Sequence, residues 1–236
     1  MKVSSKYILR EGEKMNLVLV RHGESEANFE NYWTGWLDVD LTEKGIEQAK
    51  TAGNKIKNHG LLIDVAFESV LKRSIKTAQM ILQEAEASFV PEYKTWRLNE
   101  RHYGALVGKN KDIIAEHFGA QQVKKWRRGF DEVPPLAKDN HFDRRYNHLD
   151  PRLIPTGESL HMTSQRVLPL WQDQIAPNLL DEKTVLVCGH GNSLRALIQF
   201  LENVPTNQVD QIEIPNATPM IYIFNSQLKI IQKEIL

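Results

Sequence analysis

The sequence predicts an α/β fold: a three-layer sandwich in which a mostly parallel sheet carries helices on both faces. Short runs of strand length, NLVLV at 16–20 and TVLVC at 184–188, are apolar throughout. This pattern is expected of strands that are buried on both faces. Stretches with helical periodicity alternate with such runs through much of the chain, which is typical of a parallel sheet covered by helices.

The first half of the chain supplies two strand–helix pairs. Residues 1–14 carry no convincing element, so we expect an N-terminal extension followed by a single domain over 15–236. A helix is predicted from the Thr42 cap to Gly60, with Ile46, Ala49 and Ile56 on one face. DVAFES at 64–69 predicts a second strand, and 70–85 predicts a second helix.

The second half begins with a polar region after Pro91 and two short helical patterns, which lead into a loop over 131–159. Loops of this length in compact domains are often functional. A long helix is predicted from near Gly157 to Leu180, disturbed by Pro169 and Pro177. After the strand at 184–188 we expect a helix at 194–204 and two strands, at 220–224 and 228–235, joined by a turn.

Composition restricts the class of protein. Formal net charge is zero, so no nucleic-acid or membrane partner is expected from charge. The longest apolar run is 220–224, far short of the ~20 residues that span a bilayer. The chain opens without a signal-peptide pattern, and its one cysteine, Cys188, suits a reducing compartment, so we predict a cytoplasmic protein.

Two predicted strands end alike, in Arg21-His22-Gly23 and in Gly189-His190-Gly191. Ligands of parallel sheets bind outside the carboxyl ends of the strands, and neighbouring strands lie only ~4.8 Å apart, so both histidines could face one pocket. A lone histidine here would more often be structural. Two of them suggest chemistry, because a neutral imidazole is a competent nucleophile that phosphoryl transfer would convert to phosphohistidine.

A phosphoryl group needs cations around it, and arginine binds phosphate in bidentate fashion. Arg21 and Arg73 are candidates, followed by Arg101, Lys111 and the Arg127-Arg128 pair in the polar middle region. Glu100 is the best-placed carboxyl group for acid–base work. Any one of these residues alone would most often be a solvated surface charge. Their number near the motifs favours a phosphate site.

Seven motifs resemble, in order, those of the cofactor-dependent phosphoglycerate mutases of the histidine phosphatase superfamily: RHGESEAN, TGW, DVDLTEKG, SVLKRSIKT, LNERHYGAL, KWRRGF and GHGNSLRAL. The resemblance runs from about Asn16 to Tyr222. RHG alone is shared by all branches of the superfamily, whereas LNERHYGAL together with WRRGF is more specific to the mutases. The resemblance implies a catalytic domain of the phosphoglycerate mutase type over 15–236.

The resemblance also implies residue roles: His22 as the phosphorylated nucleophile, and Glu100 as the general acid or base. His190, Arg21 and Arg73 would complete the catalytic phosphate pocket. Substrate contacts would come from Asn28, Thr34, Gly35, Arg101, Tyr103, Lys111, Arg127, Arg128, Gly191 and Asn192.

The activity implied is an isomerase of glycolysis and gluconeogenesis that interconverts 3-phosphoglycerate and 2-phosphoglycerate. 2,3-bisphosphoglycerate would prime it, without a metal, and a homodimer or homotetramer is the implied assembly. The alternatives are a histidine phosphatase that hydrolyses a small phosphorylated metabolite, and a binding module without catalysis.

Some residues depart from the family pattern or have simpler explanations. Asn216-Ala217 stands where family members usually have Thr-Gly. The chain ends at Leu236 without the long tail of some members, and the shorter end would favour hydrolysis of the phosphoenzyme. Cys188 is expected to be a buried apolar residue. His141 and His148 lack other soft ligands nearby, so no metal site is predicted. The glycine-rich motifs of dinucleotide and nucleoside triphosphate sites do not occur.

Overall fold

The computed structural model describes residues 15–138 and 143–236 and contains a six-stranded sheet. In chain order the strands are β1 (Met15–Arg21), β2 (Val65–Ser69), β3 (Glu92–Thr95), β4 (Val185–Gly189), β5 (Met220–Phe224) and β6 (Ile230–Ile235). Their order in the sheet is β3-β2-β4-β1-β5-β6. The first four in this order are parallel, and β5 pairs antiparallel with both β1 and β6.

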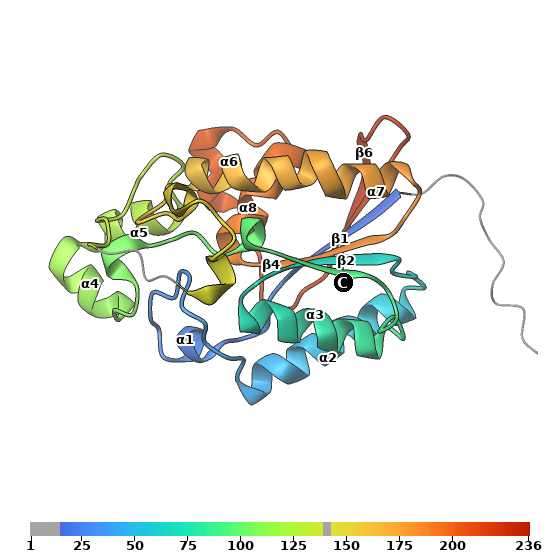
Figure 1. Cartoon of the computed structure of the whole chain (residues 1–236), viewed down its shortest axis with the longest axis horizontal. Helices are drawn as coiled ribbons and strands as arrows, with labels where there is room; N and C mark the ends of the chain where they lie inside the picture. Colours follow the sequence, from blue (N-terminus) through green and yellow to red (C-terminus); the bar gives the residue numbers. More distant parts are fainter. Residues whose placement is uncertain (1–14, 139–142) are drawn as a thin grey trace, which may run out of the picture.

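Helices cover both faces of the sheet, as Figure 1 shows. One face carries α2 (Glu43–Asn58) and α3 (Lys72–Glu84). The other carries α6 (Leu160–Leu170), α7 (Ala176–Leu180) and α8 (Gly191–Leu201). The three-layer α/β sandwich predicted from the sequence is therefore confirmed.

Alternate residues of β1 point into two different cores, because side chains alternate across a strand. Leu17 and Leu19 belong to the cluster that α6, α7 and α8 cover, and Val18 and Val20 to the cluster that α2 and α3 cover. All four side chains are fully buried. A strand with two buried faces is apolar at every position, which explains the pattern in the sequence.

A smaller lobe lies at the left of Figure 1, on the side where α1 (Glu26–Phe29) follows β1. It contains α4 (Lys111–Phe118) and α5 (Ala120–Arg128) and has its own apolar cluster around Trp33, Trp126 and Tyr103. Short 3₁₀ turns occur at Trp96–Leu98, Gly104–Leu106, Arg144–Tyr146, Pro151–Leu153 and Thr206–Gln211.

Three elements differ from the sequence prediction. β3 lies in the polar region after Pro91, where no strand was predicted. It is a short edge strand without a buried side chain, so it carries no apolar signal. The helix after Gly157 begins at Leu160 and passes through a π-helical turn, Trp171–Ile175, between Pro169 and Pro177. Pro177 has no N–H to donate to the carbonyl of Asp173, four residues earlier and within this turn, which favours the local change. Helix α8 begins at Gly191, three residues before the predicted start.

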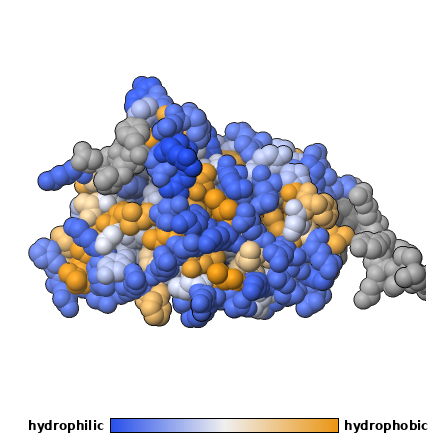
Figure 2. All heavy atoms as spheres, turned by 60° about the horizontal axis from the view of Figure 1, so that its bottom comes forward, coloured by the Kyte–Doolittle hydropathy of each residue, from blue (hydrophilic) through white to orange (hydrophobic). Residues whose placement is uncertain are grey.

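The surface of the face drawn in Figure 2 is mostly hydrophilic, with apolar side chains in small separate patches. Among the residues that the structure describes, none of the helices is both long and apolar enough to cross a membrane. The predicted N-terminal extension, 1–14, lies outside the described residues.

Candidate active site

The two histidines come together because β1 and β4 are parallel neighbours whose last residues, Arg21 and Gly189, pair. The backbone N–H of His22 donates to the carbonyl of Gly189 at 3.0 Å, which continues the ladder by one residue. The imidazole rings of His22 and His190 lie with their centroids 4.9 Å apart at 57°. One edge of the sheet therefore presents both rings to the same space.

Both imidazoles are kept neutral by their surroundings. His22 is 3% exposed and His190 is fully buried. The pKa of each lies well below its ordinary value, first because burial disfavours the charged ring and then because Arg73 is near. The His22 Nδ1 lies 2.7 Å from the carbonyl oxygen of Gly23. Because a carbonyl only accepts, Nδ1 holds the proton and the lone pair is on Nε2.

The turn after His22 requires glycine for steric reasons. A Cβ atom on Gly23 would lie 2.2 Å from the carbonyl oxygen of Gly45, in the first turn of α2. A Cβ on Gly45 would meet the carbonyl of Glu24 at 2.0 Å. This close contact of two backbones sets the loop that follows His22 against α2.

Two arginines beside the histidines, Arg73 fully buried and Arg21 half-buried, are held by carbonyl oxygens. Arg73 donates to Leu37 at 2.7 Å and to Gly35 at 2.9 Å, and Arg21 donates to Ile214 at 3.0 Å. Burial lowers the pKa of Arg73 to about 10, and it lowers the pKa of Arg21 as well. Both side chains therefore remain charged at neutral pH.

Among the buried nitrogen atoms that find no hydrogen-bond partner within the described residues are Nε of Arg21, Nε of Arg73 and Nδ1 of His190. The other ring nitrogen of His190 is hydrogen-bonded to the hydroxyl of Ser69 at 2.7 Å. Buried polar atoms are rarely left without a partner in proteins. Two guanidinium donors and an imidazole nitrogen fit the oxygens of a phosphoryl group.

Glu100 is fixed with one carboxylate oxygen bound and the other turned to the site. Its Oε1 accepts hydrogen bonds from the backbone N–H of Arg101 at 2.8 Å and of Asn192 at 3.0 Å. Asn192 lies in the first turn of α8, where a carboxylate is favoured by the helix dipole. The backbone carbonyl of Glu100 accepts a hydrogen bond from the indole N–H of Trp36 at 2.6 Å. Glu100 therefore has the position of a general acid or base.

These groups line one narrow cavity of about 80 Å³. Nine of the residues predicted from the sequence are among those that line it: Arg21, His22, Asn28, Thr34, Arg73, Glu100, Tyr103, Lys111 and Arg127. Tyr32 and Trp33 complete the lining. Burial is the first cause that lowers the pKa of Lys111 to about 8. The cavity is thus rich in positive charge at both the sheet and the lobe.

Arg101 and Arg128 do not line this cavity. Arg101 is fully buried and donates to the carbonyl oxygens of Glu158, Gly129 and Glu132. Arg128 is held by the carboxylate of Glu213, at 2.5 and 3.2 Å, and by the carbonyl of Asp210. In this structure Arg101 is thus a support for the loops, and Arg128 is turned away.

Sequence reasoning missed the buried ion pair behind Glu100. Arg166 of α6 contacts the carboxylate of Glu158 at 2.7 Å and donates to the carbonyl of Glu100 at 3.0 Å. Glu158 also accepts from the backbone N–H of His102 at 2.7 Å. The pair therefore fixes the loop that carries Glu100. It had no signal in the sequence, because a charged residue in a helix is usually solvated.

A second hidden support is Arg195, one turn into α8. It donates to the amide oxygen of Asn192 at 2.7 Å, and the Asn192 amide donates to the hydroxyl of Tyr103 at the same distance. Burial raises the pKa of Tyr103 to about 12, so its hydroxyl stays protonated. The chain of three residues thereby orders one wall of the cavity.

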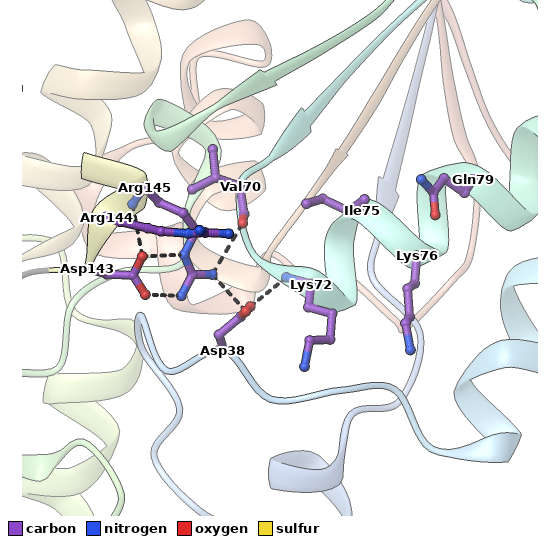
Figure 3. A pocket seen from close by; sticks show the side chains of 9 residues that line it. All are labelled: Asp38, Val70, Lys72, Ile75, Lys76, Gln79, Asp143, Arg144 and Arg145. Carbon is purple, nitrogen blue, oxygen red and sulfur yellow. Dashed lines mark hydrogen bonds and ion pairs between the residues drawn. The ribbon is translucent and has the colours of Figure 1, made fainter. Parts of the chain in front are cut away.

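A larger cavity of about 720 Å³ lies beside α3, and Figure 3 shows the side chains around it. Its charges are largely paired with one another. Arg145 contacts Asp38 at 2.8 Å and Asp143 at 2.5 Å, and Lys76 contacts Asp40 at 2.7 Å. Asp38 also accepts from the backbone N–H of Lys72 at 2.6 Å, which caps α3 next to Arg73. This cavity therefore adjoins Arg73, and none of the described residues that line it is a histidine.

Among the described residues, no group of three or more His, Cys, Asp and Glu side chains is arranged to hold a metal ion. Of the two histidines considered for a metal, His141 lies outside the described residues. Cys188 is fully buried in β4, and burial raises the pKa of its thiol to about 12, as expected of a structural residue.

A parallel sheet with an Arg-His pair at the end of one strand and a second histidine at the end of its neighbour is the arrangement of a phosphohistidine enzyme. The model of the histidine phosphatase superfamily (branch 1) matches residues 17–233. The chain belongs to this superfamily.

Comparison with known proteins finds a similar sequence of named activity and solved structures with the same fold. The chain is 51% identical over 223 residues to a 2,3-bisphosphoglycerate-dependent phosphoglycerate mutase of Lactobacillus acidophilus, with 92% of this chain and 97% of that protein covered. A solved phosphoglycerate mutase of Bacillus anthracis has the same fold, with 22% identity, a TM-score of 0.66 and coverage of 89% and 88%. So does a mycobacterial glucosyl-3-phosphoglycerate phosphatase, with 23% identity, a TM-score of 0.71 and coverage of 93% and 96%.

The neutral, buried histidines predict that the protein loses stability in acid. Below an ordinary pKa of 6.5 the unfolded state binds protons on His22 and His190 that the folded state excludes. The free energy of unfolding should therefore decrease as the pH is lowered, by up to about 1.4 kcal/mol per pH unit for each histidine. Urea titrations between about pH 7.5 and 5 measure this slope. His22→Asn should flatten it, and equal slopes in both proteins would contradict the assignment of a neutral ring.

The buried ion pair predicts a large effect of a single substitution. Arg166→Met would leave the carboxylate of Glu158, 3% exposed, buried without its partner. We expect a loss of about 3–5 kcal/mol in the free energy of unfolding, measured by urea titration. Arg152→Met breaks the exposed pair with Asp150 and serves as the matched control, with little change expected. Similar effects of the two substitutions would show that the Arg166 pair is not special.

Proposed function

We propose that the chain is a 2,3-bisphosphoglycerate-dependent phosphoglycerate mutase that interconverts 3-phosphoglycerate and 2-phosphoglycerate. The observation that carries this proposal is the unpartnered set of Arg21 Nε, Arg73 Nε and His190 Nδ1 beside the neutral ring of His22. The 51% identity to a mutase supports it, because it extends over almost the whole of both chains.

His22 is the proposed nucleophile, with 2,3-bisphosphoglycerate supplying the phosphoryl group that primes it. Transfer to the glycerate breaks the bond between Nε2 and phosphorus and forms a bond from phosphorus to the hydroxyl oxygen. Glu100 takes up the hydroxyl proton as that bond forms. In the return step Nε2 attacks the other phosphate, and Glu100 gives its proton back to the oxygen that leaves.

The charges around His22 suit this chemistry. Arg21 and Arg73 face the phosphoryl oxygens and stabilise the charge that develops during transfer. His190, neutral and hydrogen-bonded to Ser69 at 2.7 Å, contributes its other ring nitrogen. Each of these groups is already held by the protein, so little reorganisation is needed when the phosphoryl group moves.

The substrate is proposed to extend from His22 to the lobe formed by α4 and α5. Lys111 and Arg127 line the same cavity as His22 and come from that lobe. A molecule with an anionic group at each end fits a cavity that has cations both at the sheet and at the lobe. For the same reason we propose a mutase over a plain phosphatase, because hydrolysis of one phosphate has little need of the second set of cations.

We also propose that residues 15–236 act as one catalytic unit in the cytoplasm. The family model covers 17–233, and the residues of the cavity run from Arg21 to Arg127 with His190 beside them. An assembly of two or four copies remains the proposal from the family resemblance.

The decisive assay measures isomerisation and release of inorganic phosphate in the same reaction. Purified protein primed with 2,3-bisphosphoglycerate should convert 3-phosphoglycerate to 2-phosphoglycerate much faster than it releases phosphate. Labelled primer should transfer its phosphoryl group to His22 in an acid-labile, alkali-stable form, and His22→Ala should accept none. Release of phosphate as fast as isomerisation would instead support the phosphatase alternative.

Arg128 gives a prediction about substrate affinity. We propose that it exchanges the carboxylate of Glu213 for an anionic group of the substrate. Glu213→Gln weakens the competing pair, so KM for 3-phosphoglycerate should fall by roughly two- to five-fold with kcat unchanged, the range expected for an exposed ion pair. Asp181→Asn, which removes another exposed pair far from the cavity, is the control. An unchanged or raised KM would show that Arg128 serves only to hold α5.

A further inference from the structure

The segment 214–217 runs beside the end of β1 and contacts the Arg-His pair at three points. Arg21 donates to the carbonyl of Ile214 at 3.0 Å, and the N–H of Ala217 donates to the carbonyl of Arg21 at 2.8 Å. The side-chain amide of Asn216 donates to the carbonyl of His22 at 2.7 Å. The segment therefore meets both Arg21 and His22 immediately before β5 begins.

The peptide bond between His22 and Gly23 is held from both sides. Its carbonyl accepts from Asn216, and its N–H donates to the hydroxyl of Thr77 at 3.1 Å. The orientation of this peptide decides where the next carbonyl, that of Gly23, points. That carbonyl is the acceptor for Nδ1 of His22, at 2.7 Å. A chain of contacts thus connects the Asn216 amide to the imidazole ring.

Ala217 has an unusual backbone conformation that the same segment needs. Its φ is +45°, in the left-handed region that favours glycine. It is nevertheless buried, packs in the apolar cluster under α2 and α3, and donates its N–H to Arg21. The family resemblance implies that Thr-Gly is usual at these two positions, so Asn216-Ala217 departs from the family pattern.

We propose that Asn216 is a positioning residue for His22. It holds the His22–Gly23 peptide so that the Gly23 carbonyl keeps the ring in the form with the proton on Nδ1 and the lone pair on Nε2. The inference rests on the proposed function in one respect, which is that His22 is the nucleophile. The side chain of Asn216 is hydrogen-bonded to the backbone carbonyl of His22, so its effect on the ring passes through the backbone.

The test replaces the amide by groups that differ in their ability to donate. Asn216→Asp keeps the shape, but at pH 7.5 its carboxylate cannot donate to a carbonyl. Phosphorylation of His22 by 2,3-bisphosphoglycerate should become about ten-fold slower in single turnovers, with KM for the primer little changed. Asn216→Thr, which restores a hydroxyl donor, should stay within about three-fold of wild type.

A second readout is independent of the reaction. Nitrogen-15 NMR of labelled histidine reports which ring nitrogen carries the proton, and His22→Asn identifies the signals of His22. Wild type should show the proton on Nδ1, and Asn216→Asp should show a mixture of both forms. Asn203→Asp is the matched control, because it makes the same substitution at an exposed asparagine away from the site. It should change neither readout.

Wild-type phosphorylation and wild-type ring signals in Asn216→Asp would overturn the proposal. If wild type takes no label from 2,3-bisphosphoglycerate while Asn216→Asp still shifts the proton between the ring nitrogens, the proposed function fails and the positioning role holds.

Discussion

The arginines at this site are held mainly by backbone carbonyl oxygens, and the rest of the structure depends on that constraint. Arg73, Arg101 and Arg195 are buried and Arg21 is half-buried, and each donates to backbone carbonyl oxygens. A carbonyl satisfies a guanidinium donor but carries no net charge to cancel it. The cavity therefore keeps a positive potential for an anion, and burial together with that potential holds the imidazole rings neutral. Carboxylate partners would have stabilised the arginines and weakened the attraction for phosphate.

The irregular segments of the chain take their shape from this requirement. Gly35 has a φ of +52°, which aims its carbonyl at Arg73, and a side chain there would disfavour that conformation. The segment at Ile214 likewise presents a carbonyl oxygen to Arg21. The buried carboxylate of Glu158, in contrast, is matched by Arg166. The backbone of these loops thus places carbonyl oxygens where the arginine side chains can donate to them.

The sequence predicted the parts of this arrangement that follow from periodicity and from the geometry of parallel strands. β1 and β4 were predictable because strands buried on both faces are apolar throughout, and their ends brought His22 beside His190. It did not predict where the arginines point. Arg101 and Arg128 lie in family motifs, as Arg21 and Arg73 do. The direction in which their side chains point depends on carbonyl groups and carboxylates contributed by distant loops. The pattern of residues along the chain carries no information on such contacts. A polar edge strand such as β3 also has little apolar periodicity from which it could be predicted.

The order of strands in the sheet has a consequence for how the chain folds during its synthesis. β1, near the start of the chain, lies between β4 and β5, which come near its end. The bond between Asn216 and His22 joins residues 194 positions apart. A ribosome therefore exposes the apolar first strand long before either of its neighbours exists, and contacts this distant in sequence form slowly. The nascent chain has to be sheltered from aggregation until its last strands emerge, and the active site is among the last parts of the protein to be completed.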